Sequence, residues 1–277
     1  MNYDPFFLGH CEIVKMDKVS IIMPVFNAEE FLDASIGSVI AQTYDNWELL
    51  ICDDQSSDNS VNIAKKQANK DSRIKILSNK RMAGAAGARN TCLEEASGRY
   101  IAFLDADDEW LPNKLEVQLK FIVENKFPFV FGYCDNMSEK GELLSTTKAP
   151  EAVSLRKIFL SNFIPCLTVI YDTNIFGKIE QPDIKKRNDY ALWLRILGKN
   201  RDVEARCYPG VVARYRVNGY GLSANKLSGI KYFYRCLRQH AGLGIEAASF
   251  LTFSAIGFKA LKTLSPQMYN LVVTKLL

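Results

Sequence analysis

Three carboxylates follow directly on an apolar run in this chain. Residues 100–110 read YIAFLDADDEW, so Asp105, Asp107 and Asp108 stand at the end of a segment typical of a buried strand. Carboxylates this close repel one another and raise one another's pKa, and a divalent cation or the hydroxyl groups of a ligand would relieve that repulsion. Such oxygen ligands suit Mg²⁺ or Mn²⁺, together with the phosphate oxygens of a nucleotide. The alternative is a solvated acidic turn that caps a helix starting near Leu111.

The elements that must position these acids are short apolar runs that alternate with longer amphipathic stretches. The runs read VSIIMPVFN at 19–27, WELLICDDQSSDNS at 47–60 and RIKILSN at 73–79, and GAAGARN at 84–90 precedes the acidic strand. This alternation predicts a parallel sheet with helices on both faces. Ligands of such sheets bind at the carboxyl ends of the strands. Because Asp54 and Asp105 both follow strand ends, we expect one cleft to hold them.

The composition indicates a cytosolic protein with a sizeable core. The chain has 277 residues, 48% of them hydrophobic, which suffices for one large domain or one domain with a small annex. Its seven cysteines are dispersed without CxxC spacing, which favours reduced thiols over a disulfide framework or a zinc site. Two histidines are too few for a histidine-based metal site. The first residues lack the apolar core of a signal peptide, and we expect residues 1–17 to be a flexible leader.

Charge is divided unevenly along the chain. Residues 1–184 carry 19 Lys or Arg and 27 Asp or Glu, whereas residues 185–277 carry 16 and 4, a net charge of +12. A basic C-terminal third indicates an anionic partner. A membrane surface or a lipid pyrophosphate fits better than nucleic acid, because we find no motif that interleaves basic and aromatic residues.

The segment 243–261, LGIEAASFLTFSAIGFKAL, places apolar residues at helical spacing. Its uncharged run, 247–258, is much shorter than the ~20 residues that span a bilayer. Two interpretations stay open. In one, the helix packs on the rest of the protein or forms a homodimer contact. In the other, it lies on the inner membrane, and the protein is peripheral on the cytoplasmic face.

Taken in order and spacing, the segments PVFN, ICDDQSSDNS, GAAGARN and FLDADD resemble family 2 glycosyltransferases of the GT-A fold. The resemblance covers roughly residues 19–217. It implies an α/β fold of the Rossmann-like GT-A type, with a mixed, mainly parallel sheet flanked by helices. Residues 18–225 would form the catalytic domain, with a nucleotide-binding half at 18–110 and an acceptor-binding half at 111–225. Residues 226–277 would form a C-terminal amphipathic helical annex.

The resemblance also implies a reaction. Members of the family transfer a sugar from a nucleotide diphosphate sugar, most often a UDP-sugar, with inversion at the anomeric carbon and usually with Mg²⁺ or Mn²⁺. The chain looks most like bacterial enzymes that build O-antigen, capsule or teichuronic-type polysaccharides. The expected acceptor is a hydroxyl of a glycan, or of a glycan linked to polyprenyl pyrophosphate.

Several donor-binding residues follow from the same resemblance. Pro24, Val25 and Asn27 match the loop along the nucleoside, and Asp54 matches the acid that contacts the base. The alternative for Asp54 and its neighbour Asp53 is helix capping together with the serines that follow.

Two basic segments complete the expected donor site. Arg89 and Asn90 match an Arg-Asn pair, and the Arg89 guanidinium suits a diphosphate or a sugar hydroxyl. Its alternative is a surface ion pair. Arg216 and Ser223 match a segment that closes over the diphosphate, although relatives often have a histidine near Asn218; the alternative is a solvated basic loop.

The acids of the DADD run match the cation and ribose site. A DxD triplet can be aligned with this run in two ways, so the alignment does not decide whether Asp107 or Asp108 contacts the metal. Asp105 is expected to support whichever of them binds it.

The general base is expected at Asp189, ahead of an amphipathic helix. The segment KKRNDYALWLRIL at 185–197 matches a region where the family commonly has an acidic pair, whose Asp is the base. Asn188 replaces the first acid of that pair. The alternative is that Asp189 only caps the helix.

Two other classes of protein stay open. A nucleotidyltransferase also uses paired acids with Mg²⁺, but a Gly-rich basic loop would follow its first strand, and here PVFNAEEF is acidic. A non-catalytic scaffold that binds a nucleotide sugar is the second alternative, which the replacement at Asn188 keeps open.

Overall fold

The structure is a computed structural model, and it describes residues 17–217, 226–265 and 268. The predicted leader up to residue 16, Asn218 and Ser223 lie outside the described residues.

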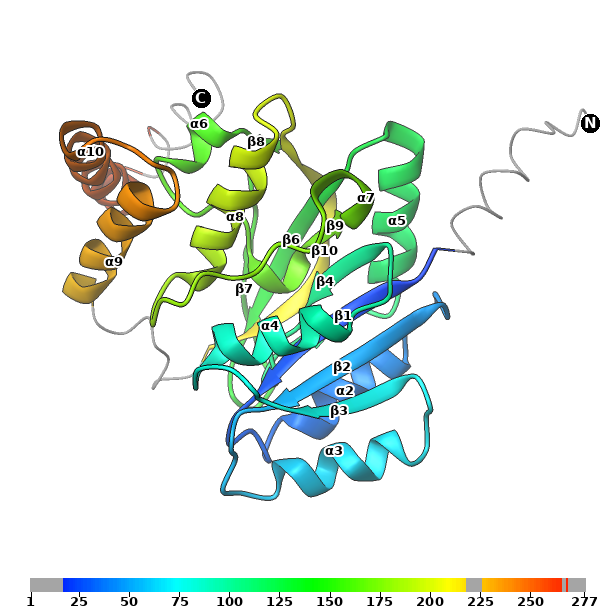
Figure 1. Cartoon of the computed structure of the whole chain (residues 1–277). Coiled ribbons are helices and arrows are strands. Elements are labelled where there is room, and N and C mark those ends of the chain that lie inside the picture. The colour runs from blue at the N-terminus through cyan, green and yellow to red at the C-terminus, as the bar shows by residue number, and fades with distance from the viewer. Residues whose placement is uncertain (1–16, 218–225, 266–267, 269–277) are drawn as a thin grey trace, which may run out of the picture.

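A mixed sheet of ten strands forms the centre of the molecule (Figure 1). The strand order is β3-β2-β1-β4-β9-β6-β10-β5, with β7 paired to β6 and β8 paired to β10. The pairs β1–β2, β2–β3, β1–β4 and β6–β10 are parallel, whereas β9 runs antiparallel to both β4 and β6. The strands are β1 Val19–Val25, β2 Trp47–Asp53, β3 Ile74–Ser78, β4 Tyr100–Phe103, β5 Glu109–Trp110, β6 Phe129–Met137, β7 Leu143–Thr147, β8 Ala152–Val153, β9 Ile170–Asp172 and β10 Ala205–Arg216.

Helices cover both faces of this sheet, as the alternation of apolar runs predicts. The helices are α2 Leu32–Ile40, α3 Ser60–Ala68, α4 Ala85–Glu95, α5 Lys114–Asn125, α6 Leu155–Ile158, η1 Cys166–Thr168, α7 Thr173–Phe176, α8 Asn188–Lys199, α9 Lys226–Gln239 and α10 Ile245–Leu264. Residue 111, where a helix was expected to begin, instead follows the short strand β5, and α5 starts three residues later.

Successive residues of the central strands point into two different cores. Ile22 of β1 and Leu50 of β2 pack on the side of α4 and α8, whereas Ile21 and Leu49 pack on the side of α2 and α5. Side chains of a strand alternate between the two faces, so strands that are apolar at every position must be covered on both. The continuous apolar runs in the sequence are explained by this double burial.

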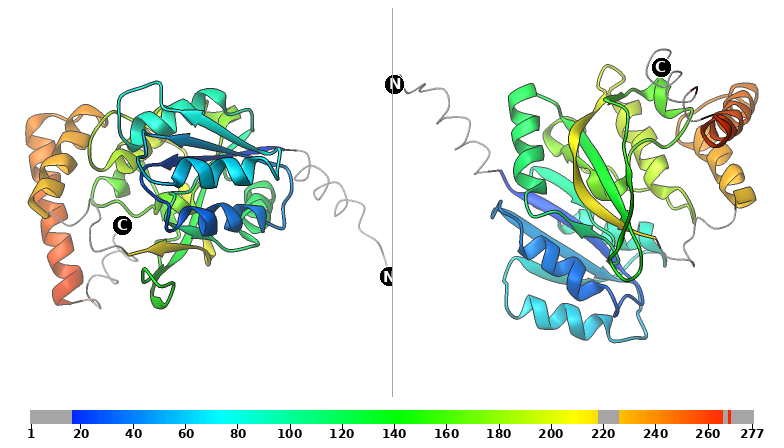
Figure 2. Two further views of the ribbon diagram at one scale, coloured as in Figure 1. Left: turned by 90° about the horizontal axis from the view of Figure 1, so that it is seen from below. Right: turned by 180° about the vertical axis from the view of Figure 1, so that it is seen from behind.

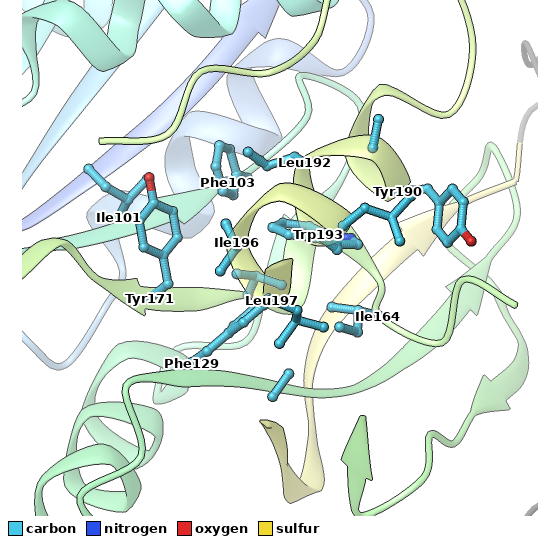
Figure 3. Packing of buried hydrophobic residues seen from close by; sticks show 14 of the residues in the cluster. Ile101, Phe103, Phe129, Ile164, Tyr171, Tyr190, Leu192, Trp193, Ile196 and Leu197 are labelled. Carbon is cyan, nitrogen blue, oxygen red and sulfur yellow. The ribbon is translucent and has the colours of Figure 1, made fainter. Parts of the chain in front are cut away.

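The tryptophan of α8 fixes that helix to the sheet. Figure 3 shows Trp193 among Phe103, Phe129 and other buried side chains of the same core. Its ring centroid lies 5.9 Å from that of Phe103 and 5.5 Å from that of Phe129. Because Phe103 is the last residue of β4, this packing brings the start of α8 to the edge of the sheet where the acidic segment begins.

At one edge of the molecule α9 packs against α8, and α10 packs against α9 (Figures 1 and 2). The Phe233 ring of α9 stacks on the Tyr190 ring of α8 at a centroid distance of 5.0 Å. The Arg187 Nε group, just before α8, donates a hydrogen bond of 2.9 Å to the Gly229 carbonyl of α9. The α9 helix is therefore held directly on the residues that flank Asn188 and Asp189.

Candidate active site

The candidate site lies where β1, β2 and β4 end. In the parallel register Val25 of β1 is paired with Asp53 of β2, and Ile22 of β1 with Phe103 of β4, so the carboxyl ends of the strands meet at one edge. The acidic segment leaves β4 there and turns back, with the Asp108 amide donating to the Asp105 carbonyl at 3.1 Å. The structure thus places Asp54 and the acidic segment at the same edge of the sheet, as expected.

The turn after β4 separates the three acids. Asp105 and Asp107 are partly exposed, whereas Asp108 is 1% exposed. The buried Asp108 Oδ1 accepts a hydrogen bond of 2.8 Å from the Arg216 backbone amide at the end of β10. Burial raises the pKa of Asp108 well above its ordinary value, and the charges of Asp107 and Asp105 raise it further. Asp105 and Asp107 are thus the two acids of this turn that solvent reaches.

Arg89 links the acidic segment to the start of α8. The side chain is almost fully buried, and its Nη2 group pairs with the Asp105 carboxylate. Its Nη1 group donates to Gln181 Oε1 at 3.2 Å and, more weakly, to Asn188 Oδ1 at 3.4 Å. Burial by itself would lower the pKa of Arg89, but the charge and hydrogen bond of Asp105, together with other nearby acidic groups, outweigh burial and raise the pKa. Arg89 is therefore a buried cation inside the site, not a member of a surface ion pair.

Asp189 lies in the first turn of α8, not ahead of the helix as the sequence suggests. Its Oδ2 accepts a hydrogen bond of 2.8 Å from Asn162 Nδ2. The N-cap residue of α8 is Arg187, whose side chain makes no capping hydrogen bond, while Asn188 Oδ1 accepts from the Asp189 amide at 2.8 Å. Burial raises the pKa of Asp189, against hydrogen bonding by the backbone and the nearby Arg89 charge, which lower it. A carboxylate with a raised pKa is a stronger base.

Asp54 holds the loop that leads into α4. Its Oδ1 accepts from Asn79 Nδ2 and its Oδ2 from the Gly84 amide, both at 2.6 Å. Gly84 has a φ of 120°, which a residue with a side chain rarely adopts. Gly87 approaches the chain so closely that an added Cβ would lie 2.0 Å from the Met82 carbonyl oxygen. The glycines of GAAGARN are required by this loop, and Asp54 fixes its position.

Asp53 forms the turn after β2. Its carboxylate accepts from the amides of Gln55 and Ser56. The residue before α3 is Asn59, so neither Asp53 nor Asp54 caps that helix.

The expected nucleoside loop is tied to that turn. Pro24 and Val25 end β1, and Asn27 has a positive φ of 45°. The Asn27 side-chain oxygen accepts from the Ser57 amide at 2.8 Å, while the Asn27 amide donates to Ser56 Oγ at 3.0 Å. The loops after β1 and β2 form one rim of the site.

Two of the expected donor ligands are engaged with protein groups. Asn90 makes a pair of hydrogen bonds with the Gln181 backbone, at 2.9 and 2.8 Å. The Arg216 guanidinium donates to the carbonyls of Asp107 and Glu139 and to the Glu109 carboxylate, at 2.7 to 2.9 Å. Both side chains brace the loops around the acids, and their contacts with a diphosphate stay predictions.

Sequence reasoning missed three polar residues that hold the site together. Gln181 contacts Arg89, Asn162 contacts Asp189, and Asn79 contacts Asp54. Each lies on a connecting segment and reaches a partner 25 to 92 positions away. Isolated amide residues in loops carry no spacing signal, so no pattern in the sequence could have identified them.

Known proteins were compared with the chain over this whole region. Residues 20–171 match the family Glycosyl transferase family 2. The chain is 43% identical over 213 residues to the UDP-Glc:alpha-D-GlcNAc-diphosphoundecaprenol beta-1,3-glucosyltransferase WfgD of Escherichia coli, covering 77% of this chain and 82% of WfgD. The chain is a family 2 glycosyltransferase.

A second relative of this glycosyltransferase comes from Bacillus subtilis. The putative teichuronic acid biosynthesis glycosyltransferase TuaG of Bacillus subtilis is 37% identical over 214 residues, 77% of this chain and 84% of TuaG. Family membership confirms the expected enzyme class and excludes the nucleotidyltransferase alternative.

Solved structures confirm the expected GT-A fold of the glycosyltransferase. S. aureus TarS in complex with UDP-GlcNAc superposes with a TM-score of 0.66 at 20% identity, over 93% of this chain and 76% of TarS. The mannosyltransferase PcManGT of Pyrobaculum calidifontis, in complex with GDP-Man and Mn²⁺, gives 0.65 at 16% identity, over 93% and 78%. Within the described part of the chain, every helix falls short of the length and apolar character needed to cross a bilayer.

Proposed function

We propose that this glycosyltransferase moves a sugar from a UDP-sugar to a hydroxyl of a lipid-linked glycan in bacterial surface polysaccharide synthesis, with inversion at the anomeric carbon. The name of WfgD describes a UDP-glucose donor and an acceptor on diphosphoundecaprenol. That of TuaG describes teichuronic acid synthesis. These relatives support the donor and acceptor classes proposed here.

One observation carries the proposal. The Arg89 guanidinium contacts Asp105, at the strand end expected to bind the donor, and Asn188, the neighbour of the candidate base Asp189. A single side chain thus spans the distance between the proposed donor acids and the proposed base. Displacement at an anomeric carbon needs a leaving diphosphate and an attacking hydroxyl on opposite sides of the same atom, and this spacing is short enough to hold one sugar between them.

Asp189 is assigned the proton transfer. Its carboxylate takes the proton of the acceptor hydroxyl while that oxygen forms the new bond to the anomeric carbon. The bond from that carbon to the nucleoside diphosphate breaks, and the electron pair leaves with the diphosphate. Asn162 orients the carboxylate by donating to Oδ2.

The acids after β4 fit Mg²⁺ or Mn²⁺. In the described residues no three His, Cys, Asp or Glu side chains form a ready-made metal cluster. Mg²⁺ commonly binds through one or two carboxylates together with substrate phosphates, so a two-carboxylate edge suits a cation that arrives with the donor diphosphate. Asp107, supported by Asp105, would hold it. A bound cation would neutralise charge that develops on the leaving diphosphate. Asp108, which is buried against β10, is assigned to positioning the turn.

The test is turnover of a UDP-sugar panel on a lipid diphosphate glycan, with Mn²⁺ titrated, for the wild type and three variants. Asp189→Asn should lower kcat by about a hundredfold or more while UDP affinity is kept. Asp107→Asn should raise the Mn²⁺ concentration needed for half activity, and Asp108→Asn should chiefly lower the melting temperature. NMR of the first-formed product should show the inverted anomer.

Other outcomes would refute parts of this assignment. Full activity of Asp189→Asn would remove the base role, and equal metal dependence of all three variants would remove the cation site at Asp107. UDP binding without turnover of any sugar by the wild type would favour the scaffold alternative.

A further inference from the structure

The helix α10 exposes an unusually apolar side to solvent. Phe250 and Phe253 are 71% and 74% exposed, and Leu264 is 83% exposed. The name α10 face is used here for five exposed residues of this helix, Ile245, Phe250, Phe253, Ile256 and Leu264. Phe250 and Phe253 share one side of the helix, because positions three or four residues apart lie together. Leu264, eleven positions after Phe253, returns to that side after about three turns.

The opposite side of the same helix is already used. Ala248 is fully buried, Thr252 is nearly so, and Leu251 and Ala255 pack into the core that contains Phe233 of α9. A surface helix normally has one apolar side toward the core and a polar side toward solvent. Here both sides are apolar and only one of them is covered. The exposed α10 face therefore indicates a site of contact with another apolar surface.

Positive charge surrounds this helix pair. In the sequence, residues 226–277 carry seven Lys or Arg and a single acid, Glu246. Lys231 and Arg235 are exposed on α9, which packs beside α10 at the edge of the molecule (Figures 1 and 2). A helix that combines exposed aromatic residues with neighbouring cations has the composition of one that lies in the interface of an anionic membrane.

We propose that the α10 face, together with Lys231 and Arg235, binds the surface of an anionic phospholipid bilayer. The phenylalanines enter the boundary between headgroups and acyl chains, and the cations contact lipid phosphates. The helix has 20 residues and is about 30 Å long, so it offers a broad contact while lying flat.

A second copy of the chain fits this surface less well. In a two-fold dimer built on the α10 face, the same patch of each copy meets its equivalent. The second copy would bring seven Lys or Arg and a single acid in residues 226–277, so it offers little negative charge to these cations. An anionic bilayer satisfies the apolar face and the positive charge at the same time.

The position of α9 relates this surface to the site. Gly229 and Phe233 of α9 contact Arg187 and Tyr190, which flank Asn188 and Asp189. A membrane bound at the helix pair would present a lipid-linked acceptor close to the start of α8. This last step rests on the proposed function, whereas lipid binding by the α10 face does not.

The experiment is flotation of the full chain with vesicles of phosphatidylcholine alone or of phosphatidylcholine and phosphatidylglycerol in equal parts. The wild type should bind the anionic vesicles, and added salt should weaken that binding. Phe250→Ser/Phe253→Ser should weaken it about tenfold for each phenylalanine. Lys231→Gln/Arg235→Gln should weaken it about fivefold for each cation, on anionic vesicles only.

The matched control is Ile175→Ser, because Ile175 is an exposed apolar residue, 50% exposed, on α7. It should bind vesicles like the wild type. Turnover of a water-soluble acceptor should be unchanged in Phe250→Ser/Phe253→Ser, whereas turnover of an acceptor embedded in vesicles should fall. If the wild type turned over neither the water-soluble nor the vesicle-embedded acceptor, the proposed function would be overturned, while the flotation result would still test lipid binding.

Three results would overturn the membrane proposal. The first is that the wild type fails to float with anionic vesicles, and the second is that the double phenylalanine variant floats as well as the wild type. The third is that light scattering shows a dimeric wild type and a monomeric double variant, with no vesicle binding by either. In that case the α10 face is an interface between copies of the chain.

Discussion

Asn188 shows how a single side chain changes the charge balance of the site. An acid at this position would give Arg89 a second carboxylate partner, but Asn188 offers only an amide oxygen at 3.4 Å. Asp105 is therefore the carboxylate hydrogen-bonded to the guanidinium. Asp108 is buried against Arg216, and our proposal places the cation at the partly exposed Asp107. The three acids of this turn thus have three different surroundings.

The pH dependence of turnover tests the role of Asn162 at the same scale. A base acts in its deprotonated form, so activity is lost as the pH falls through the pKa of Asp189. Burial raises that pKa, and the hydrogen bond from Asn162 lowers it. Asn162→Ala should therefore move the acidic limb of kcat/KM to higher pH.

The control for that measurement is Asp189→Asn, whose residual activity should lack this limb. Thermal unfolding of Asn162→Ala separates a shifted pKa from a loss of folded protein. An acidic limb at the wild-type pH would show that Asn162 does not act through the Asp189 carboxylate.

At the scale of elements, both the core on the α4 side of the sheet and the site depend on α8. Its Trp193 packs on the sheet beside Phe103, while its first turn carries Asp189. On the outer side, α9 stacks Phe233 against Tyr190 and places the same ring beneath the Arg187 guanidinium, at 5.3 Å. The helix is thus held between the sheet and α9, and its first turn depends on both.

Removal of the Phe233 ring tests this dependence. Phe233 is 4% exposed, so Phe233→Ala should lower the free energy of unfolding by about 3 kcal/mol or more through the cavity it leaves. Phe233→Leu, which keeps most of the volume, should remain folded but lower kcat more than it changes UDP affinity. Urea unfolding and steady-state kinetics measure the two effects.

The neighbouring half-exposed residue Tyr232 supplies the control, because Tyr232→Ala removes a ring of similar size that lies outside the core. Stability and kcat should stay near the wild-type values. If Phe233→Leu kept full kcat, α9 would stabilise the fold without positioning Asp189.

At the scale of the whole molecule, the candidate site lies at the carboxyl ends of the central strands, and a buried carboxylate joins the strands near their amino ends. Glu48, in β2, accepts hydrogen bonds from Ser20 Oγ of β1 and from the amide and hydroxyl of Ser97, each at 2.7 Å, and pairs with Lys75 of β3 at 2.9 Å. It joins three strands and the segment before β4. The strand ends that carry the acids are in register partly because this contact fixes the other ends.

Acid denaturation should report on Glu48. Burial by itself would raise its pKa, but the hydrogen bonds lower it from 4.5 to about 2. A carboxyl with a lowered folded-state pKa contributes stability above its unfolded pKa and loses that contribution as the pH falls toward the folded value. The contribution is about 3 kcal/mol at neutral pH.

Urea unfolding of the wild type and Glu48→Gln checks this value. The wild type should be the more stable protein at neutral pH, and the difference should shrink between pH 4.5 and about 2. A difference that does not change with pH would mean that packing, not the charge of Glu48, stabilises the strands.

The sequence alone determined the layers of the fold and the edge at which the acids lie. Strands that are apolar at every position require cover on both faces, and acids that follow such strands must fall at their carboxyl ends. The motifs around Asn27, Asp54, Arg89 and Asp105 indicated the family, and the comparisons confirmed it. These features depend on the types of residues that lie close together in the sequence, and such patterns can be recognised without a structure.

Only the tertiary structure decided which polar atoms meet. The turn after β4 directs Asp108 inward and Asp107 outward, although the two are adjacent in the sequence. Asn90 and Gln181 meet across 91 positions, and Arg216 fills its donors with carbonyls that a sequence does not reveal. Hydrogen bonding depends on the direction of each side chain and on contacts between segments far apart in the sequence. Patterns of neighbouring residues determine neither of them.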